Sequence, residues 1–149
     1  MPNRLFSSTG ISASGMSAER QRMELIANNI ANANSTRSAN GQPYQRKNLI
    51  FESAASKGAS GLVLPGETGE MAGVRVIGTS ADTSEFPMVF MEGHPDADGN
   101  GMVRMPNVSL PNEMVDLITA SRSYEANLRA LTLYKEMVEQ TLSLLAGGR

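Results

Sequence analysis

The chain of 149 residues contains no cysteine, no tryptophan and only one histidine. The missing cysteines exclude disulfide bonds, thiol catalysis and thiolate metal sites together. Four phenylalanines and three tyrosines are the only aromatic residues, so large side chains that could fill a core are scarce. Leucine, isoleucine, valine and phenylalanine make up 31 residues, about 21% of the chain, which is close to the boundary below which chains tend to stay disordered. A well-filled, self-sufficient globular core is therefore not expected.

Long apolar runs and an excess of positive charge are also missing. No stretch approaches the roughly 18 apolar residues needed to span a bilayer. The first ten residues hold one arginine and no apolar run of the kind found in a secretory signal peptide. The net charge is −2, which gives no support to a nucleic-acid binder, because such domains are usually basic. We expect a soluble chain without a cleaved signal peptide.

Charge and glycine divide the chain into three parts. Residues 1–50 carry six basic and two acidic side chains, whereas residues 51–112 carry three and eight. Ten of the 14 glycines lie between Gly41 and Gly101, and such a density breaks helices and makes turns. We therefore expect a mainly α protein with a small β part. Its regions are an N-terminal helix within residues 1–36, a β-rich middle at 37–108 with a flexible loop at about 54–69, and a C-terminal helix within 109–149.

The C-terminal segment has the clearest periodicity. Two sets of residues repeat every seven positions, as the a and d positions of a coiled coil do. The first set has two polar interruptions: Met114, Ser121, Leu128, Lys135 and Leu142. The second set is apolar or aromatic throughout: Leu117, Tyr124, Leu131, Val138 and Leu145. Ser109 as a cap and Pro111 in the first turn predict where this helix begins, and Gly147 predicts its end.

The N-terminal helix has a weaker pattern of the same kind. Met16, Met23 and Ile30 repeat every seven residues, with Ile26 beside them. Nearby alanines would let another helix approach closely, and a run of asparagines predicts that the helix frays near residues 34–35.

Between the helices, short apolar runs bounded by glycine and proline predict strands. They lie at residues 45–53, 73–78, 86–91 and 101–105. These strands are too few and too short for more than a small sheet.

Two possible chemical sites lie in the middle region. Asp96, Asp98 and Asn100 fit the opening of a calcium-binding EF-hand loop, but its twelfth position is Asn107 where a bidentate glutamate is required. A turn-rich loop whose polar side chains bond their own backbone is the better interpretation. His94 could act as a base with a neighbouring carboxylate, but no motif supplies a nucleophile. We predict no catalytic residue, no cofactor and no metal.

Several longer motifs carry a family resemblance. The segment Gly10-Ile-Ser-Ala-Ser-Gly-Met16, followed by Arg22 and Ile26-Ala-Asn-Asn-Ile-Ala-Asn-Ala33, resembles the N-terminal signature of bacterial flagellar rod and hook proteins. Residues 112–127 are similar to the matching C-terminal helix, while residues 41–44, 93–98 and 105–108 resemble the short proximal rod subunits of that family. Residues 54–85 match no part of it.

The resemblance implies a structural protein rather than an enzyme. In this family the terminal helices pair as a coiled coil, and subunits stack helically into a hollow tube that carries torque. Here that implies an antiparallel pairing and one set of assembly-interface residues: Met16, Met23, Ile26, Ile30, Met114, Leu117, Tyr124, Leu128, Leu131, Val138, Leu142 and Leu145. The implied partners are other copies, other rod proteins, the flagellar export apparatus and the basal-body ring proteins, with no nucleic acid and no small-molecule substrate. The implied location is the basal-body rod in the periplasm.

Two alternatives stay open at this point. The chain could be a soluble coiled-coil adaptor in the cytoplasm, or a calcium-responsive module that uses Asp96, Asp98 and Asn100. We also expect the two helices of a free subunit to be partly disordered and to order on assembly, because their narrow apolar seams bury little surface.

Overall fold

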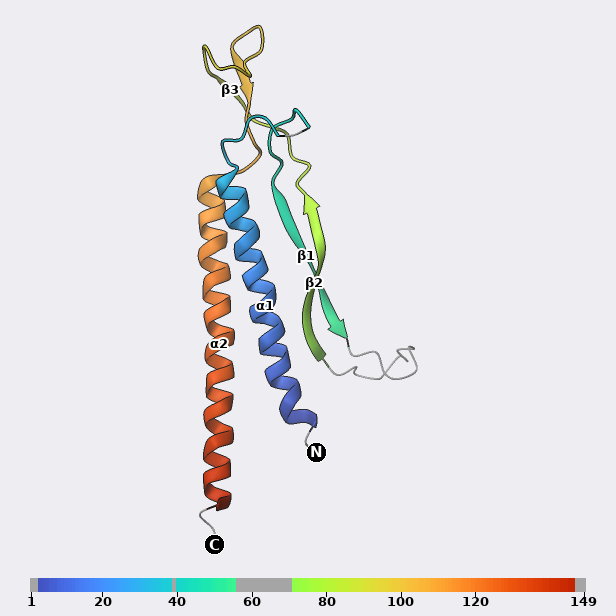
Figure 1. Ribbon diagram of the computed structural model, residues 1–149, viewed down its shortest axis with the longest axis vertical. Helices are drawn as coiled ribbons and strands as arrows, with labels where there is room; N and C mark the ends of the chain where they lie inside the picture. The colour runs from blue at the N-terminus through green and yellow to red at the C-terminus, as the bar shows by residue number, and fades with distance from the viewer. Residues whose placement is uncertain (1–2, 39, 56–70, 147–149) are drawn as a thin grey trace. The chain divides into compact units, whose positions relative to one another are not determined.

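The computed structural model describes residues 3–38, 40–55 and 71–146. Helix α1 (Asn3–Ala31) is followed by β1 (Lys47–Ala55), β2 (Met71–Ala81), β3 (Met88–Phe90), β4 (Met102–Arg104) and helix α2 (Leu110–Ala146) (Figure 1). Each helix is continuous, and the strands form two small sheets. The prediction of a mainly α protein with a small β part is confirmed.

The helix ends follow from local chemistry. The Ser109 carbonyl accepts the Glu113 N–H at 3.0 Å, and Pro111 lies in the first turn, where a missing N–H costs little. At the other helix, Asn32 donates its N–H to the Asn28 carbonyl, and its side-chain amide donates to the same oxygen at 2.8 Å. This competition for backbone groups accompanies the end of α1 at Ala31, and a turn continues to residue 34.

The four predicted strand regions all contain strands. The first two strands form one sheet, drawn with opposite directions in Figure 1. In the second sheet β3 and β4 are antiparallel, with Val89 opposite Val103. The predicted loop at about 54–69 lies outside the described residues, apart from its first two positions.

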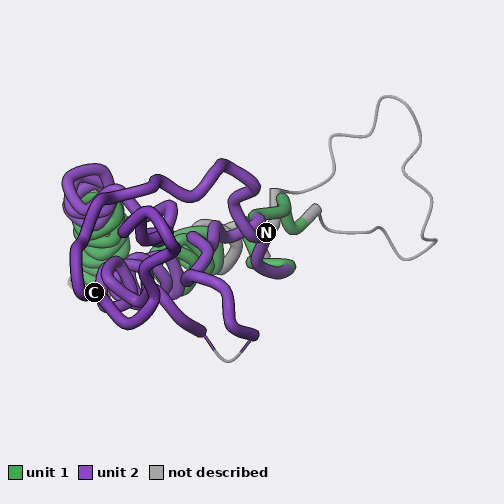
Figure 2. Tube along the Cα trace, turned by 90° about the horizontal axis from the view of Figure 1, so that it is seen from above, with its two compact units in different colours: residues 1–20, 51–77, 120–149 green, residues 21–50, 78–119 purple. Residues whose placement is uncertain are grey.

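The chain divides into two compact units (Figure 2). Unit 1 comprises residues 1–20, 51–77 and 120–149, and unit 2 comprises residues 21–50 and 78–119, so each unit contains a length of both helices. Among the described residues, the largest fully buried side chains are Glu113, Val103 and Asn29. Because two of these three are polar, hydrogen bonding has an unusually large part in holding unit 2 together.

Candidate assembly interface and its polar support

The polar network of unit 2 is centred on Glu113, in the first turn of α2. Its side chain is fully buried, and its carboxylate oxygens accept hydrogen bonds from Arg46 Nε and, at 3.1 Å, from Asn29 Nδ2. A buried carboxylate is costly unless it is paired with a cation and hydrogen-bonded, and Glu113 meets both conditions. Because Asn29 belongs to α1 and Arg46 precedes β1, Glu113 joins three segments of unit 2.

Asn29 is the second centre of this network, with 1% of its surface exposed. Its Nδ2 donates to the Lys47 carbonyl at 3.0 Å as well as to Glu113, and its Oδ1 accepts from the Lys47 N–H and, at 2.9 Å, from the Tyr44 hydroxyl. The amide thus uses its full hydrogen-bonding capacity. Burial, and then the negative charge of Glu113, raises the pKa of Tyr44.

Arg46 brings three carboxylates together. Besides its bond to Glu113, its guanidinium lies 3.3 Å from Asp116 Oδ2 and 3.7 Å from Asp82 Oδ2. Partial burial opposes the charge of Arg46, but the bond and charge of Glu113, aided by Asp116 and Asp82, outweigh it and raise the pKa of Arg46. Asp116 also pairs with Arg22 of α1 at 3.7 Å.

Asn107 and Ser84 fix the position of Asp82 in the same unit. The Ser84 N–H donates to Asp82 Oδ1 at 2.9 Å, and the bonds from Ser84, followed by the charge of Arg46, lower the pKa of Asp82. Asn107 accepts the Arg46 N–H at 2.7 Å and donates to the Asp82 carbonyl at 3.1 Å. Loop, strand and helix are therefore tied by side-chain amides as well as by charge.

In unit 1 the contact between α1 and β2 depends on the close approach of their backbones rather than on buried charge. Ser14 Oγ in α1 donates to the Ile11 carbonyl and accepts the Val74 N–H of β2 at 3.1 Å. Gly73, at φ +97°, lies directly against Ser14, so any side chain there would collide with the hydroxyl. A Cβ on Gly15 would lie 2.9 Å from Asn127 Nδ2 of α2. Gly73 is needed where α1 passes close by, whereas Gly15 leaves room for the Asn127 side chain.

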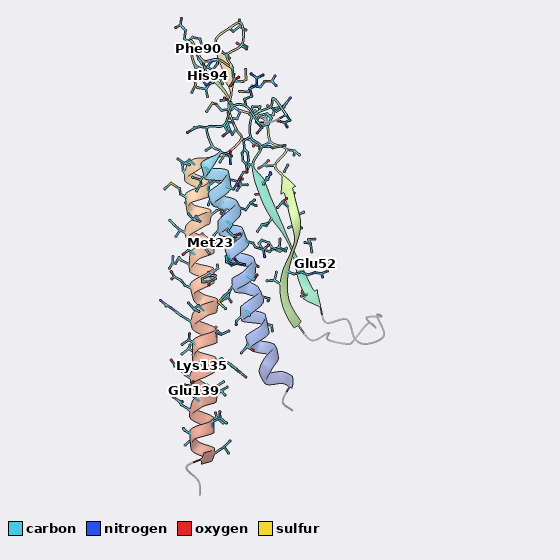
Figure 3. The ribbon with its side chains drawn as sticks, viewed as in Figure 1. Met23, Glu52, Phe90, His94, Lys135 and Glu139 are labelled. Atoms are coloured by element: carbon cyan, nitrogen blue, oxygen red, sulfur yellow. The ribbon has the colours of Figure 1, made fainter. Side chains whose placement is uncertain are left out.

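The predicted interface residues of α1 differ in exposure. Ile26 is buried, with 5% of its surface exposed, whereas Met16, Met23 and Ile30 are half-buried. Met23, one of these half-buried residues of α1, is labelled in Figure 3. Three of the four therefore keep surface that another molecule could contact.

A regular stripe of buried or half-buried residues runs along α2. Its steps alternate between four and three, as in a coiled coil. Its members are Glu113, Leu117, Ala120, Tyr124, Asn127, Leu131, Tyr134 and Val138. The seven-residue set that starts at Leu117 belongs to this stripe as far as Val138. The other members of the stripe each lie one position before a residue of the set that starts at Met114. They are Glu113, Ala120, Asn127 and Tyr134.

The set that starts at Met114 is largely exposed. The exposed fractions are 55% for Met114, 45% for Leu128 and 60% for Leu142, and Leu145 of the other set is 75% exposed. Lys135 is also exposed and lies 3.6 Å from Glu139 on the same helix (Figure 3). The role of these apolar residues in subunit contacts stays a prediction.

Sequence reasoning missed the polar network. Asn29 was interpretable from the pattern only as a poor helix former, and Glu113 only as an acidic residue in a first turn. Asn29 lies in the last turn of α1, within a run of asparagines typical of a helix end, so no local signal marked it as buried.

The two alternative chemical sites have local partners. Asp98 Oδ1 accepts the N–H groups of Asn100 and Met102, and His94 Nδ1 accepts the Asp96 N–H at 3.1 Å. Across residues 3–38, 40–55 and 71–146, no three His, Cys, Asp or Glu side chains are grouped so that they could hold a metal ion. These contacts match a turn whose side chains bond its own backbone.

Comparisons with known proteins define the class. Residues 11–37 match the family described as "Flagella basal body rod protein", and residues 100–144 match "Flagellar basal body rod FlgEFG protein C-terminal". No helix in the described part of the chain combines the length and hydropathy needed to cross a membrane. The chain is thus a flagellar basal-body rod protein.

The relatives identify the family within that class. The chain is 43% identical to flagellar basal-body rod protein FlgC of Yersinia enterocolitica, covering 90% of this chain and 92% of the relative. It is 38% identical to FlgC of Borreliella burgdorferi (96% and 99% covered) and 37% identical to FlgC of Bacillus subtilis (93% and 97% covered). The chain belongs to the FlgC family and is a structural subunit of the rod. The predicted family is confirmed, and the cytoplasmic adaptor is not favoured.

Proposed function

We propose that this chain stacks helically with copies of itself and with other rod proteins to form the proximal rod, which transmits torque for motility. The observation that carries the proposal is the similarity to FlgC rod proteins along nearly the whole chain. The exposed leucines and methionines of α2 support it, because an apolar helix face left in water favours contact with another subunit.

We further propose that α1 and α2 pair as an antiparallel coiled coil. Within unit 2, Asn29 contacts Glu113 while Arg22 contacts Asp116, so the partner number rises as the α1 number falls. Within unit 1, Gly15 faces Asn127. The alternate steps of four and three along α2 also favour this arrangement. The corresponding regions are residues 1–36, 37–108 and 109–149.

The exposed members of the predicted interface are the side chains we assign to subunit contacts. An open helical assembly needs heterologous contacts, in which one patch meets a different patch on the next subunit. Exposed Met114 and Leu128 lie on α2, while half-buried Met16 and Met23 lie on α1. The chain thus has apolar surface on both helices for such contacts.

The same proposal covers export and neighbours. A rod subunit has to cross the inner membrane, and we infer passage through the flagellar export apparatus without cleavage of a signal peptide. The ring proteins of the basal body are further proposed neighbours. We infer a mechanical role with no catalysis.

Exposed residues allow a test that separates assembly from folding. Replacing Met114 and Leu128 by Asp leaves buried contacts intact, so the purified chain should keep its circular dichroism spectrum. Cells carrying this double variant should lose motility and contain basal bodies without a complete rod. A Gln140→Asp variant, changed at an exposed polar position of the same helix, should swim normally. Normal rods in the double variant would refute the proposed contacts, and a chain found only in cytosol would refute the rod location.

A further inference from the structure

The β3–β4 hairpin carries an exposed apolar face. The exposed fractions are 45% for Met88 and 62% for Phe90, and Figure 3 labels Phe90 there. The register places Met88 opposite Arg104 and Phe90 opposite Met102, so these four side chains share one face of the ribbon. The opposite face holds Val103, which is fully buried. We call Met88, Phe90, Met102 and Arg104 the hairpin face.

A cavity of about 440 Å³ opens on this face. Met88, Met102 and Arg104 line it together with residues of the loops around Arg37 and Asp96. The cavity therefore combines apolar side chains with charged ones, all within unit 2.

The charges around this cavity are unequally satisfied. Asp96 accepts a bond from Thr36 at 2.8 Å and pairs with Arg37 at 3.5 Å, and Asp98 accepts two backbone N–H groups. Arg104, by contrast, has no ion-pair partner among the residues that the structure describes. A partner for this face should bring apolar side chains and negative charge.

The last turns of α2 have that chemistry. Leu142, Leu144 and Leu145 are exposed by 60%, 78% and 75%. The last turn contains no basic side chain, so no cation within the helix offsets the partial negative charge of its unpaired carbonyl groups. In the antiparallel pairing proposed above, Gly15 lies opposite Asn127. The first residue of α1, Asn3, is 12 residues before Gly15, so it lies level with about residue 139 of α2, which is 12 residues after Asn127. The turns beyond have no α1 residue opposite them.

We propose that the hairpin face of one copy binds the last turns of α2 from a second copy. The leucines lie against Met88 and Phe90, and the Arg104 guanidinium meets the carbonyl end of the helix, where a cation is favourable. Two different patches of one chain then form a heterologous contact that continues from copy to copy. This inference rests on the proposed self-assembly and names the surfaces that would carry it.

The absence of native cysteine allows a direct test. Met88→Cys and Leu145→Cys chains, with tags of different size, are produced together in cells, and isolated basal bodies are oxidised. A disulfide-linked heterodimer of the two tags is expected. A Glu92→Cys chain, changed at an exposed position of the same hairpin region that does not line the cavity, should give about tenfold less heterodimer. Met102→Cys replaces Met88→Cys if the latter chain does not enter rods.

The charge contact has its own measurement. Adding Arg104→Glu to the Met88→Cys chain should lower the heterodimer yield about tenfold, because a favourable charge at a helix end becomes a repulsive one. Arg104→Lys should keep most of the yield. Equal yields from both variants would refute the role of charge.

The outcomes separate this inference from the rod function. Complete rods that contain both chains but no heterodimer would refute the docking and leave the rod function standing. A disulfide formed within one chain carrying both cysteines would refute the second copy as the occupant. Failure of the unmodified chain to enter rods would refute the rod function itself.

Discussion

The two units contain different lengths of the same two helices, and different interactions stabilise each unit. In unit 2, buried Glu113, Asn29 and half-buried Arg46 satisfy one another with hydrogen bonds and charge. In unit 1, Gly73 lies so close to Ser14 that a side chain would not fit, and Gly15 leaves room for the Asn127 side chain. Unit 2 is therefore sensitive to the removal of atoms, and unit 1 to their addition.

This difference matters for a subunit with few large apolar side chains. Hydrogen bonds and ion pairs depend strongly on direction, so the network of unit 2 specifies one geometry. Close contact at glycine specifies distance but gains little energy from burial. Each of the following substitutions tests one side of this contrast.

Glu113→Ala should have the largest effect on stability. The change removes the buried carboxylate that Arg46 and Asn29 share and leaves Arg46 with only the more exposed Asp116 and Asp82. Breaking a buried pair in this way costs about 3 kcal/mol. Urea unfolding followed by tyrosine fluorescence measures the loss. Glu92→Ala, at an exposed carboxylate, should change the free energy of unfolding by less than about 0.5 kcal/mol. Similar values for the two variants would show that the network contributes nothing special.

Gly73→Ala tests the addition of atoms in unit 1. Its positive φ alone costs an alanine about 1–2 kcal/mol, and the new Cβ also collides with Ser14 Oγ. We expect a total loss of about 2 kcal/mol or more in thermal or urea unfolding. Gly78→Ala is the matched control in the same strand, since a Cβ there meets nothing within 4 Å. A Gly73→Ala variant as stable as the Gly78→Ala variant would contradict the close approach.

Tyr44→Phe removes one hydroxyl from the network of unit 2. The loss of its bond to Asn29 should cost about 1 kcal/mol at neutral pH. Because the folded state raises the pKa of Tyr44, its neutral form stabilises the fold fully below the ordinary pKa near 10.0, and this contribution is lost as pH rises through the higher folded value. Unfolding measured between neutral and alkaline pH should show a steeper loss in the unmodified chain than in Tyr44→Phe. Parallel pH profiles would rule out this coupling.

Gly10→Ala and Gly15→Ala compare two positions of one helix. Alanine favours a helix over glycine by about 1 kcal/mol, and a Cβ on Gly10 meets nothing within 4 Å. Gly10→Ala should therefore raise the melting temperature. Gly15→Ala should gain less or lose stability, because Asn127 has to move away from the new methyl group. Equal gains at both positions would show that α2 does not constrain Gly15.

The same contrast explains what the sequence could predict. The strands and the start of α2 follow from local signals: apolar runs between glycines, and Pro111 after Ser109. The Leu117 set was visible because its members are apolar. Its companions include Ala120 and Asn127, whose burial depends on what lies opposite them, so a pattern of apolar residues cannot find them. The Asn29–Glu113 bond joins positions 84 residues apart, and no local pattern encodes such a pairing.

The exposed ion pair of unit 1 should matter least. Lys135 and Glu139 have exposed fractions of 74% and 64%, and their order, with the cation first, opposes the helix dipole. Surface pairs of this kind contribute about 0–0.5 kcal/mol. Lys135→Ala should therefore change the free energy of unfolding by less than about 0.5 kcal/mol, roughly a sixth of the loss expected for Glu113→Ala. Because dissolved ions screen exposed charges, added salt should reduce any difference between Lys135→Ala and the unmodified chain. A loss above about 1 kcal/mol would mean that Lys135 has a partner beyond Glu139.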